Sequence, residues 1–81
     1  MTTPADDAAL RAQRALRVGD AERNSALSAL GEHLAAGRIT LDEYGERNAN
    51  IMVSATCGEL ADVFGDLPAP HPALPGPYAA A

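Results

Sequence analysis

One stretch decides the fold of this chain: Ala36-Gly37-Arg38-Ile39-Thr40-Leu41-Asp42-Glu43-Tyr44-Gly45-Glu46-Arg47. Gly37 stands where a helix should end, because glycine readily takes the left-handed conformation that closes a helix. Thr40 and Glu43 have the spacing of a capping box, in which each side chain accepts a hydrogen bond from the other's backbone amide. The stretch therefore predicts one helix, a tight corner and the start of a second helix.

The residues before the corner predict a helix over about 20–36. Asp20 is expected to cap its N-terminus, since a carboxylate can accept hydrogen bonds from the free amides of the first turn. Leu27, Leu30 and Leu34 recur at helical spacing and predict one apolar stripe.

The residues after the corner predict two further helices, over about 41–54 and 57–65. Thr56 and Glu59 repeat the capping-box spacing at the start of the third helix. The expected apolar face of the second helix consists of Leu41, Tyr44, Asn48, Ile51, Met52 and Ala55, and that of the third of Leu60, Val63, Phe64 and Leu67. The fold class is therefore all-α, a small three-helix domain.

Two segments flank this domain, which we place at 17–68. Residues 1–16 form an N-terminal arm that is either flexible or carries an extra helix over 8–17. Residues 69–81 form a Pro-rich linker or tail; five of the six prolines lie between residues 68 and 78. Proline lacks an amide hydrogen, so this tail should be extended or disordered and is not expected to dock on the domain. Such a spacer indicates the N-terminal part of a longer protein.

Composition excludes several classes of function. Six arginines and no lysine stand against 11 acidic residues, giving a net charge of −5, which argues against nonspecific nucleic-acid binding. The single cysteine cannot form an internal disulfide. The start of the chain lacks the basic and apolar regions of a signal peptide, and no apolar run is long enough to span a bilayer. We expect a cytoplasmic protein, either free or at the cytoplasmic face of the membrane.

A family resemblance rests on the order and spacing of several short motifs. These are Arg17-Val18-Gly19-Asp20-Ala21-Glu22-Arg23, Gly37 to Tyr44, Glu46-Arg47, Thr56, Glu59-Leu60 and Asp66-Leu67-Pro68. Together they resemble the SHOCT-like domain of unknown function, the domain of unknown function 1707 family, over about 17–68. The chain departs from the usual pattern at Asn48, Gly45 and Ala55.

The resemblance implies a short all-helical module, often N-terminal in bacterial proteins and followed by a Pro-rich linker. In its relatives, membrane helices or a cell-envelope-response domain often come next. The family has no established catalytic residues, so the resemblance assigns none to this chain.

The candidate contact residue is Arg38, which lies in the corner and has no partner required by spacing. Arg47 is expected to close an edge of the core, with its stem on apolar surface and its charge paired with a nearby carboxylate. Cys57, His33 and Met52 contain soft metal ligands, but no two of them have ligand spacing, so no metal site is expected. No cofactor, small-molecule substrate or catalytic constellation is predicted, and the chain is not expected to be an enzyme.

Three functions from different classes remain. The leading one is a protein-interaction or assembly module that binds a protein partner or pairs with itself as a homodimer. The alternative is a helix-turn-helix-like DNA-binding regulator, although Asp42, Glu43 and Glu46 would give the recognition helix the wrong charge. The third is association with a membrane surface through the stripe of Arg11, Arg14 and Arg17, which requires a membrane segment beyond residue 81.

Overall fold

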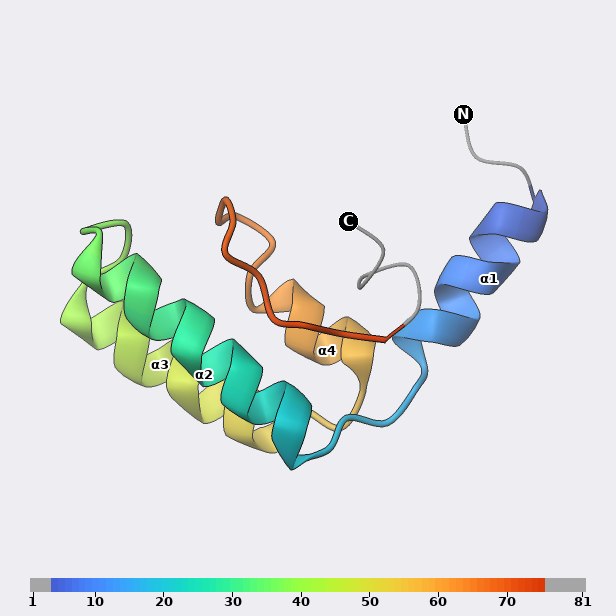
Figure 1. The fold of residues 1–81 in the computed structure, drawn as a ribbon, viewed down its shortest axis with the longest axis horizontal. Coiled ribbons are helices and arrows are strands. Elements are labelled where there is room, and N and C mark those ends of the chain that lie inside the picture. Colours follow the sequence, from blue (N-terminus) through green and yellow to red (C-terminus); the bar gives the residue numbers. More distant parts are fainter. Residues whose placement is uncertain (1–3, 76–81) are drawn as a thin grey trace.

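The structure, a computed structural model, describes residues 4–75, with side chains from residue 7 onward. Four helices form this part of the chain (Figure 1): α1 (Pro4–Arg14), α2 (Asp20–Ala35), α3 (Leu41–Val53) and α4 (Cys57–Asp62). The all-α class is confirmed. Of the two alternatives for the N-terminal arm, the structure has the helix, which covers 4–14 instead of 8–17. Residues 1–3 and 76–81 of the expected arm and tail lie outside the described part.

The corner between α2 and α3 has the predicted construction. Gly37 has a φ of 77°, and the amides of Gly37 and Arg38 donate to the carbonyl oxygens of Leu34 and His33, each at 3.0 Å. This pair of bonds is a Schellman motif, which satisfies carbonyls left free at a helix end. The Thr40 amide lies 2.8 Å from a Glu43 carboxylate oxygen, and the Glu43 amide lies 3.1 Å from the Thr40 hydroxyl. The capping box is therefore complete, and α3 lies alongside α2 (Figure 1).

Gly37→Ala is expected to lower the free energy of unfolding by about 1 kcal/mol, because an L side chain is strained in the left-handed region. A Cβ at this position would meet no atom within 4 Å, so the cost comes from the backbone alone. Urea unfolding followed by circular dichroism measures it. The control is Gly31→Ala in the interior of α2, where a Cβ also meets nothing within 4 Å. That change should stabilise the helix. If the Gly37→Ala chain were as stable as the Gly31→Ala chain, Gly37 could not be in the left-handed conformation described here.

The N-terminus of α2 differs from the prediction. Gly19, not Asp20, is the N-cap residue, and its amide donates to the Glu22 carboxylate at 2.6 Å. Asp20 is the first helical residue, and its exposed carboxylate lies 3.6 Å from the Arg23 guanidinium. The assignment of Asp20 as the cap is wrong because the chain enters the helix one residue earlier, where Glu22 satisfies the Gly19 amide.

The start of α4 shows half of the predicted capping box. The Glu59 amide lies 3.3 Å from the Thr56 hydroxyl, as expected, but the Glu59 carboxylate accepts from the Ala55 amide at 3.1 Å. Thr56 lies in an isolated antiparallel bridge with Arg17. This bridge attaches the segment between α1 and α2 to the segment that precedes α4.

The helix α4 is shorter than predicted and ends at Asp62 instead of residue 65. The amides of Val63, Phe64 and Gly65 each donate to the carbonyl three residues earlier, so the helix tightens into turns before the chain reverses. The predicted apolar face is nevertheless present, with Leu60, Phe64 and Leu67 buried and Val63 packed against them.

The buried face of α2 is rotated relative to the expected leucine stripe. Leu30 is fully buried, but Leu27 and Leu34 are only partly buried. The buried residues of α2 are Ala26, Ala29, Leu30 and His33. Small side chains therefore occupy much of this interface, which allows other segments to approach the α2 backbone closely.

The face predicted for α3 is also only partly correct. Ile51 is its one fully buried residue, and Tyr44 packs at the edge of the core. Leu41 and Met52, which the periodicity placed in the core, are exposed instead. A helix of this small domain contacts the core along a narrow line, so apolar residues on either side of that line face solvent.

The C-terminal segment 69–75, which we call the strap, is extended as expected, but the expectation that it does not dock is wrong. It passes along α2 toward α1 (Figure 1), and Pro72 and Leu74 are buried. The Ala73 amide donates to the Ser25 hydroxyl at 2.8 Å, and Gln13 on α1 donates to the Pro75 carbonyl. The strap docks because its buried side chains cover apolar residues at the end of α4 and in the turns after it, beside α2.

Candidate functional site

The corner residue Arg38 is exposed, but it has a partner, although its spacing in the sequence requires none. Its guanidinium Nη1 lies 3.2 Å from the His33 Nδ1. The contact arises because the Schellman turn brings the arginine back over the last turn of α2. Arg38 therefore caps a buried histidine and is not an unoccupied contact residue.

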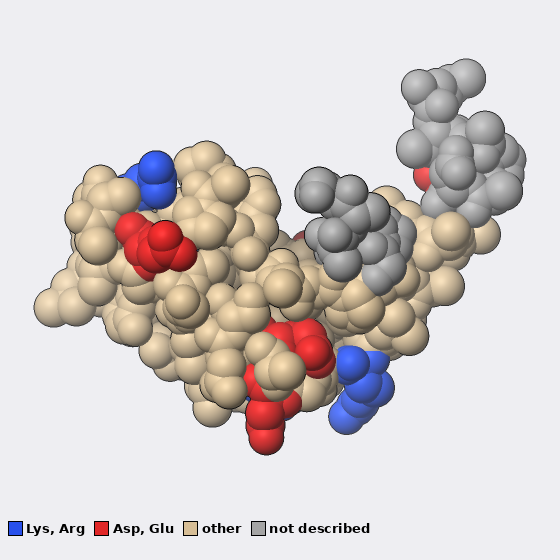
Figure 2. All heavy atoms as spheres, in the orientation of Figure 1, with Lys and Arg blue, Asp and Glu red and all other residues tan. Residues whose placement is uncertain are grey.

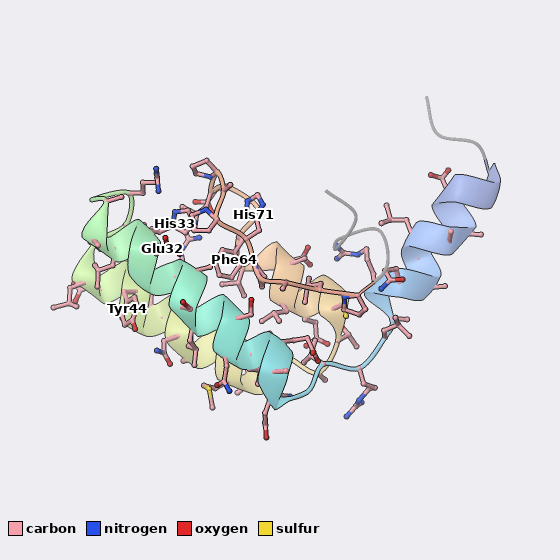
Figure 3. All side chains as sticks on the ribbon, viewed as in Figure 1. Glu32, His33, Tyr44, Phe64 and His71 are labelled. Atoms are coloured by element: carbon pink, nitrogen blue, oxygen red, sulfur yellow. The ribbon has the colours of Figure 1, made fainter. Side chains whose placement is uncertain are left out.

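His33 is completely buried. Its Nε2 lies 2.8 Å from the Pro70 carbonyl oxygen. A carbonyl can only accept, so Nε2 carries the hydrogen and Nδ1 accepts from Arg38. Figure 3 shows His33, Phe64 and His71 grouped between α2 and the strap; the His33 and Phe64 ring centroids are 6.1 Å apart. The imidazole thus joins α2, the corner and the strap.

Arg47 closes an edge of the core, as predicted, but its partner is Asp66. Nη1 and Nη2 donate to the two Asp66 carboxylate oxygens at 2.7 and 2.8 Å, and Nη1 also donates to the Val63 carbonyl at 2.8 Å. The Arg47 side chain is only 19% exposed. This arrangement, the Arg47–Asp66 pair, ties α3 to the turns that follow α4.

The same pair shifts both ionisations. The Arg47 guanidinium lowers the pKa of Asp66 from 3.8 to about 2, and the Asp66 carboxylate raises the pKa of Arg47. At the corner, hydrogen bonds from the Thr40 amide and hydroxyl lower the pKa of Glu43. Both carboxylates are therefore held in the charged form by groups that are in place only when the chain is folded.

The free energy of unfolding of the domain is expected to decrease as the pH is lowered and Asp66 becomes protonated. The pKa of Asp66 is lower in the folded state, so its contribution is fully present above about pH 4 and is lost as the pH falls toward about 2. Melting temperatures between pH 6 and pH 2 measure this. Asp66→Asn should flatten the dependence in that window, whereas Asp42→Asn on the exposed face of α3 should retain it. Equal slopes for the two variants would contradict the role of Asp66.

Cys57 is fully buried at the start of α4, and burial raises the pKa of its thiol. A protonated, inaccessible thiol is a poor nucleophile and a poor metal ligand. Met52 lies on the exposed side of α3, so the structure does not bring it together with Cys57 in the core. Among the described residues, no group of three or more His, Cys, Asp or Glu side chains could hold a metal ion.

Large apolar side chains are exposed along one side of α3. We take this side of the helix as the candidate interaction site. Leu41 is 72%, Met52 55% and Val53 77% exposed. Gly45 and Ala49 are exposed between them. Leu41, Gly45, Ala49 and Met52 recur at i, i+4, i+8 and i+11, so they share one face. We call Leu41, Gly45, Ala49, Met52 and Val53 the α3 face.

A shallow groove continues from the C-terminal end of the α3 face toward α4. Its volume is about 360 Å³. The lining residues are Asn50, Val53, Ser54, Glu59, Asp62 and Val63. Asp62 accepts two hydrogen bonds from Arg14 at 3.0 and 2.9 Å, which hold α1 against α4. The groove is therefore bordered by carboxylates, one of which is already paired within the chain.

Charged side chains do not form a continuous patch on the face seen in Figure 2, where basic and acidic groups occur in small separate areas. Of the described helices, none is long and apolar enough to cross a membrane.

The fold and its polar contacts define a small all-helical domain, in which arginine and histidine side chains connect the helices to the connecting segments. The chain belongs to the DUF1707 SHOCT-like domain family, whose model matches residues 16–68. Neither a curated protein nor a solved structure matches the chain significantly. The family is one of unknown function, and nothing in it or in the described part of the fold points to catalysis.

Sequence reasoning missed the partners of these polar groups. Asp66 belongs to one of the motifs that carried the family resemblance, and a carboxylate just before a chain reversal could have suggested a partner for Arg47. The contacts of His33 with Pro70 and of Ser25 with Ala73 had no local signal, because they join residues 37 and 48 positions apart.

Proposed function

We propose that this protein is a noncatalytic assembly module, which pairs with a second copy of itself through the α3 face. The observation that carries the proposal is the exposure of Leu41, Met52 and Val53 along one side of a well-formed helix. Single exposed apolar residues are ordinary, but several on one helix face indicate a surface that another molecule covers.

The composition of the α3 face suits a second helix. Gly45 and Ala49 lie in its centre, where their small size lets another backbone approach closely. Leu41 lies near one end and Met52 and Val53 lie near the other. The face is about 18 Å long at 1.5 Å per residue. Two copies could therefore place Leu41 of each against the Met52 region of the other.

Charge favours an antiparallel arrangement of the two helices. The acidic residues on and beside the face, Asp42 and Glu46, both lie in the N-terminal half of α3, whereas residues 48–54 carry no charge. In an antiparallel pair the acidic halves lie far apart and each faces an uncharged half. A parallel pair would place like charges together, which is destabilising.

The expected interface is small. One helix face buries less than the roughly 800 Å² per partner of a standard interface, so the isolated domain should pair weakly. The Pro-rich composition after residue 68 supports a further part of the proposal, that the module is the N-terminal part of a longer bacterial protein located in the cytoplasm or at the membrane. Holding several copies near one another would then raise their effective concentration.

No observation favours the DNA-binding alternative. The helices α2 and α3 lie side by side (Figure 1), whereas the helices of a helix-turn-helix cross at roughly 90–120°. The first turn of α3 contains Asp42 and Glu43, which would face DNA phosphates with negative charge.

Sedimentation velocity over a wide range of concentration tests the pairing. The average mass of the unaltered chain should rise with concentration, and Leu41→Glu should abolish the rise without unfolding the helix, because Glu is favourable in a first helical turn. Leu10→Glu on α1 is the matched control and should behave as the unaltered chain. A mass that stays monomeric at every concentration would overturn the proposal, and so would an equal loss of self-association in the Leu41 and Leu10 variants. Binding of a different protein to the α3 face, in place of a second copy, would also overturn it.

A further inference from the structure

The strap lies beyond the part of the chain that matches the family, which ends at residue 68, yet it covers part of the apolar interior of the domain. Its side chains alternate: Pro72 and Leu74 are buried, whereas His71 and Ala73 are exposed. This alternation is that of an extended peptide lying on a surface, with every second side chain directed toward it.

The strap follows a line of residues along α2. Ser25, Ala29 and His33 lie at i, i+4 and i+8, so they form one row about 12 Å long. Pro70 is bonded to His33 at one end of the row, and Ala73 is bonded to Ser25 at the other. Three residues of extended chain span about 10 Å, which matches the row. The strap therefore runs antiparallel to α2.

The polar contacts between the strap and the helices engage the strap's main chain. His33 donates to the Pro70 carbonyl, Ser25 accepts from the Ala73 amide, and Gln13 donates to the Pro75 carbonyl. Peptide-binding grooves contact an extended ligand in a similar way. Hydrogen bonds to its main chain provide affinity, and pockets for alternate side chains provide specificity.

The strap does not fill the space that it covers. A hollow of about 290 Å³ remains between it and the end of α4 with the turns that follow. The hollow is lined by Ala61, Phe64, Gly65 and Leu67 of the domain and by His71, Pro72 and Leu74 of the strap. The hollow is partly open to solvent and is lined mostly by apolar side chains, so it leaves room for further apolar groups beside the strap.

We propose that this surface, bounded by the Ser25–Ala29–His33 row and by Phe64, is a binding groove for an extended, uncharged, proline-containing peptide segment, and that the strap is its intramolecular ligand. The partner is a segment of another protein that presents apolar side chains at alternate positions, as Pro72 and Leu74 do here. Such a segment enters when the strap leaves. The groove is formed by residues of α2 and by Phe64, whereas the α3 face is on a different helix. The proposed peptide binding therefore does not depend on pairing of two copies through α3.

A labelled synthetic peptide with the sequence of residues 67–75 tests the proposal by fluorescence anisotropy. In the unaltered chain, the strap competes with the peptide at a high effective concentration because it belongs to the same molecule. Leu74→Ala weakens this competition, so the peptide should bind the full-length Leu74→Ala chain at least tenfold more tightly than the unaltered chain. The same peptide with Leu74→Asp should bind the Leu74→Ala chain at least tenfold more weakly. Circular dichroism confirms that the variant is folded. Equal binding to the two chains, or equal binding of the two peptides, would overturn the proposal.

Amide hydrogen exchange on the unaltered chain provides the second readout, which does not depend on a variant that folds. If the strap can leave by itself, the Ala73 amide should exchange at least 100-fold faster than the amide of Leu30 in the centre of α2. Equal exchange rates would show that the strap opens only when the whole domain unfolds, and would exclude a groove that a second peptide can enter.

Discussion

The Ile51→Ala chain is expected to lose about 2–5 kcal/mol of its free energy of unfolding, the usual cost of removing a fully buried isoleucine. Ile51 is completely buried and is the one buried residue of α3, so it is the main anchor of that helix on the core. For a domain of this size, such a loss lowers the melting temperature by at least about 10 °C. A small domain has little stability to lose, so a largely unfolded variant is within the expected range.

Thermal and urea unfolding followed by circular dichroism measure this loss. Met52→Ala is the matched control, since the neighbouring side chain is more than half exposed and its truncation should change stability by less than about 0.5 kcal/mol in dilute solution. If the Met52 variant lost as much stability as the Ile51 variant, α3 would have to pack with a different face on the core.

The second large effect is expected for Arg47→Ala. This change removes the bond from the Arg47 guanidinium to the Val63 carbonyl as well as both bonds to Asp66. A hydrogen bond that involves a charged group contributes about 1.5–3 kcal/mol to stability, and the truncation also removes the packing of the arginine stem. The melting temperature should fall by roughly 10 °C.

The control for this prediction is Arg11→Ala, which alters an exposed arginine on α1. Differential scanning calorimetry of the two variants at neutral pH gives the comparison. The Arg11 variant should melt close to the unaltered chain. Equal melting temperatures for the two variants would show that Arg47 does not secure the edge between α3 and the turns after α4.

Local features of the fold were predictable from the sequence. Gly37, Thr40 and Glu43 act through bonds that span five residues or fewer, so their residue types and spacing are sufficient to define the corner. The prediction for Asp20 failed even at this range, because Gly19 and Glu22 provide a competing cap that is equally compatible with the sequence.

Long-range packing was not predictable in the same way. The rotated face of α2 uses Ala26 and Ala29, whose small side chains carry little hydrophobic signal although they are almost completely buried. The docking of the strap depends on a row of α2 residues that forms only after the helices have assembled. Periodicity could not distinguish the buried Ile51 from the exposed Leu41, since both occur at helical spacing.

The candidate site was missed for a related reason. Arg38 was singled out because no residue near it in sequence required its charge, but the folded corner places it beside His33. Two residues of the α3 face, Leu41 and Met52, are predicted for the core because they are apolar and occur at helical spacing. An apolar side chain in the core and one in an interface look alike in the sequence. They differ only in whether the fold leaves them exposed, so the sequence alone does not distinguish them.

The pairing of two copies through the α3 face is tested most directly by nuclear magnetic resonance of the unaltered chain during dilution. We predict concentration-dependent amide shifts along the α3 face, from Leu41 through Gly45 and Ala49 to Met52 and Val53, with the amides of the strap unaffected. Shifts that do not change from millimolar to micromolar concentration, or that change on a different surface, would contradict the proposed pairing.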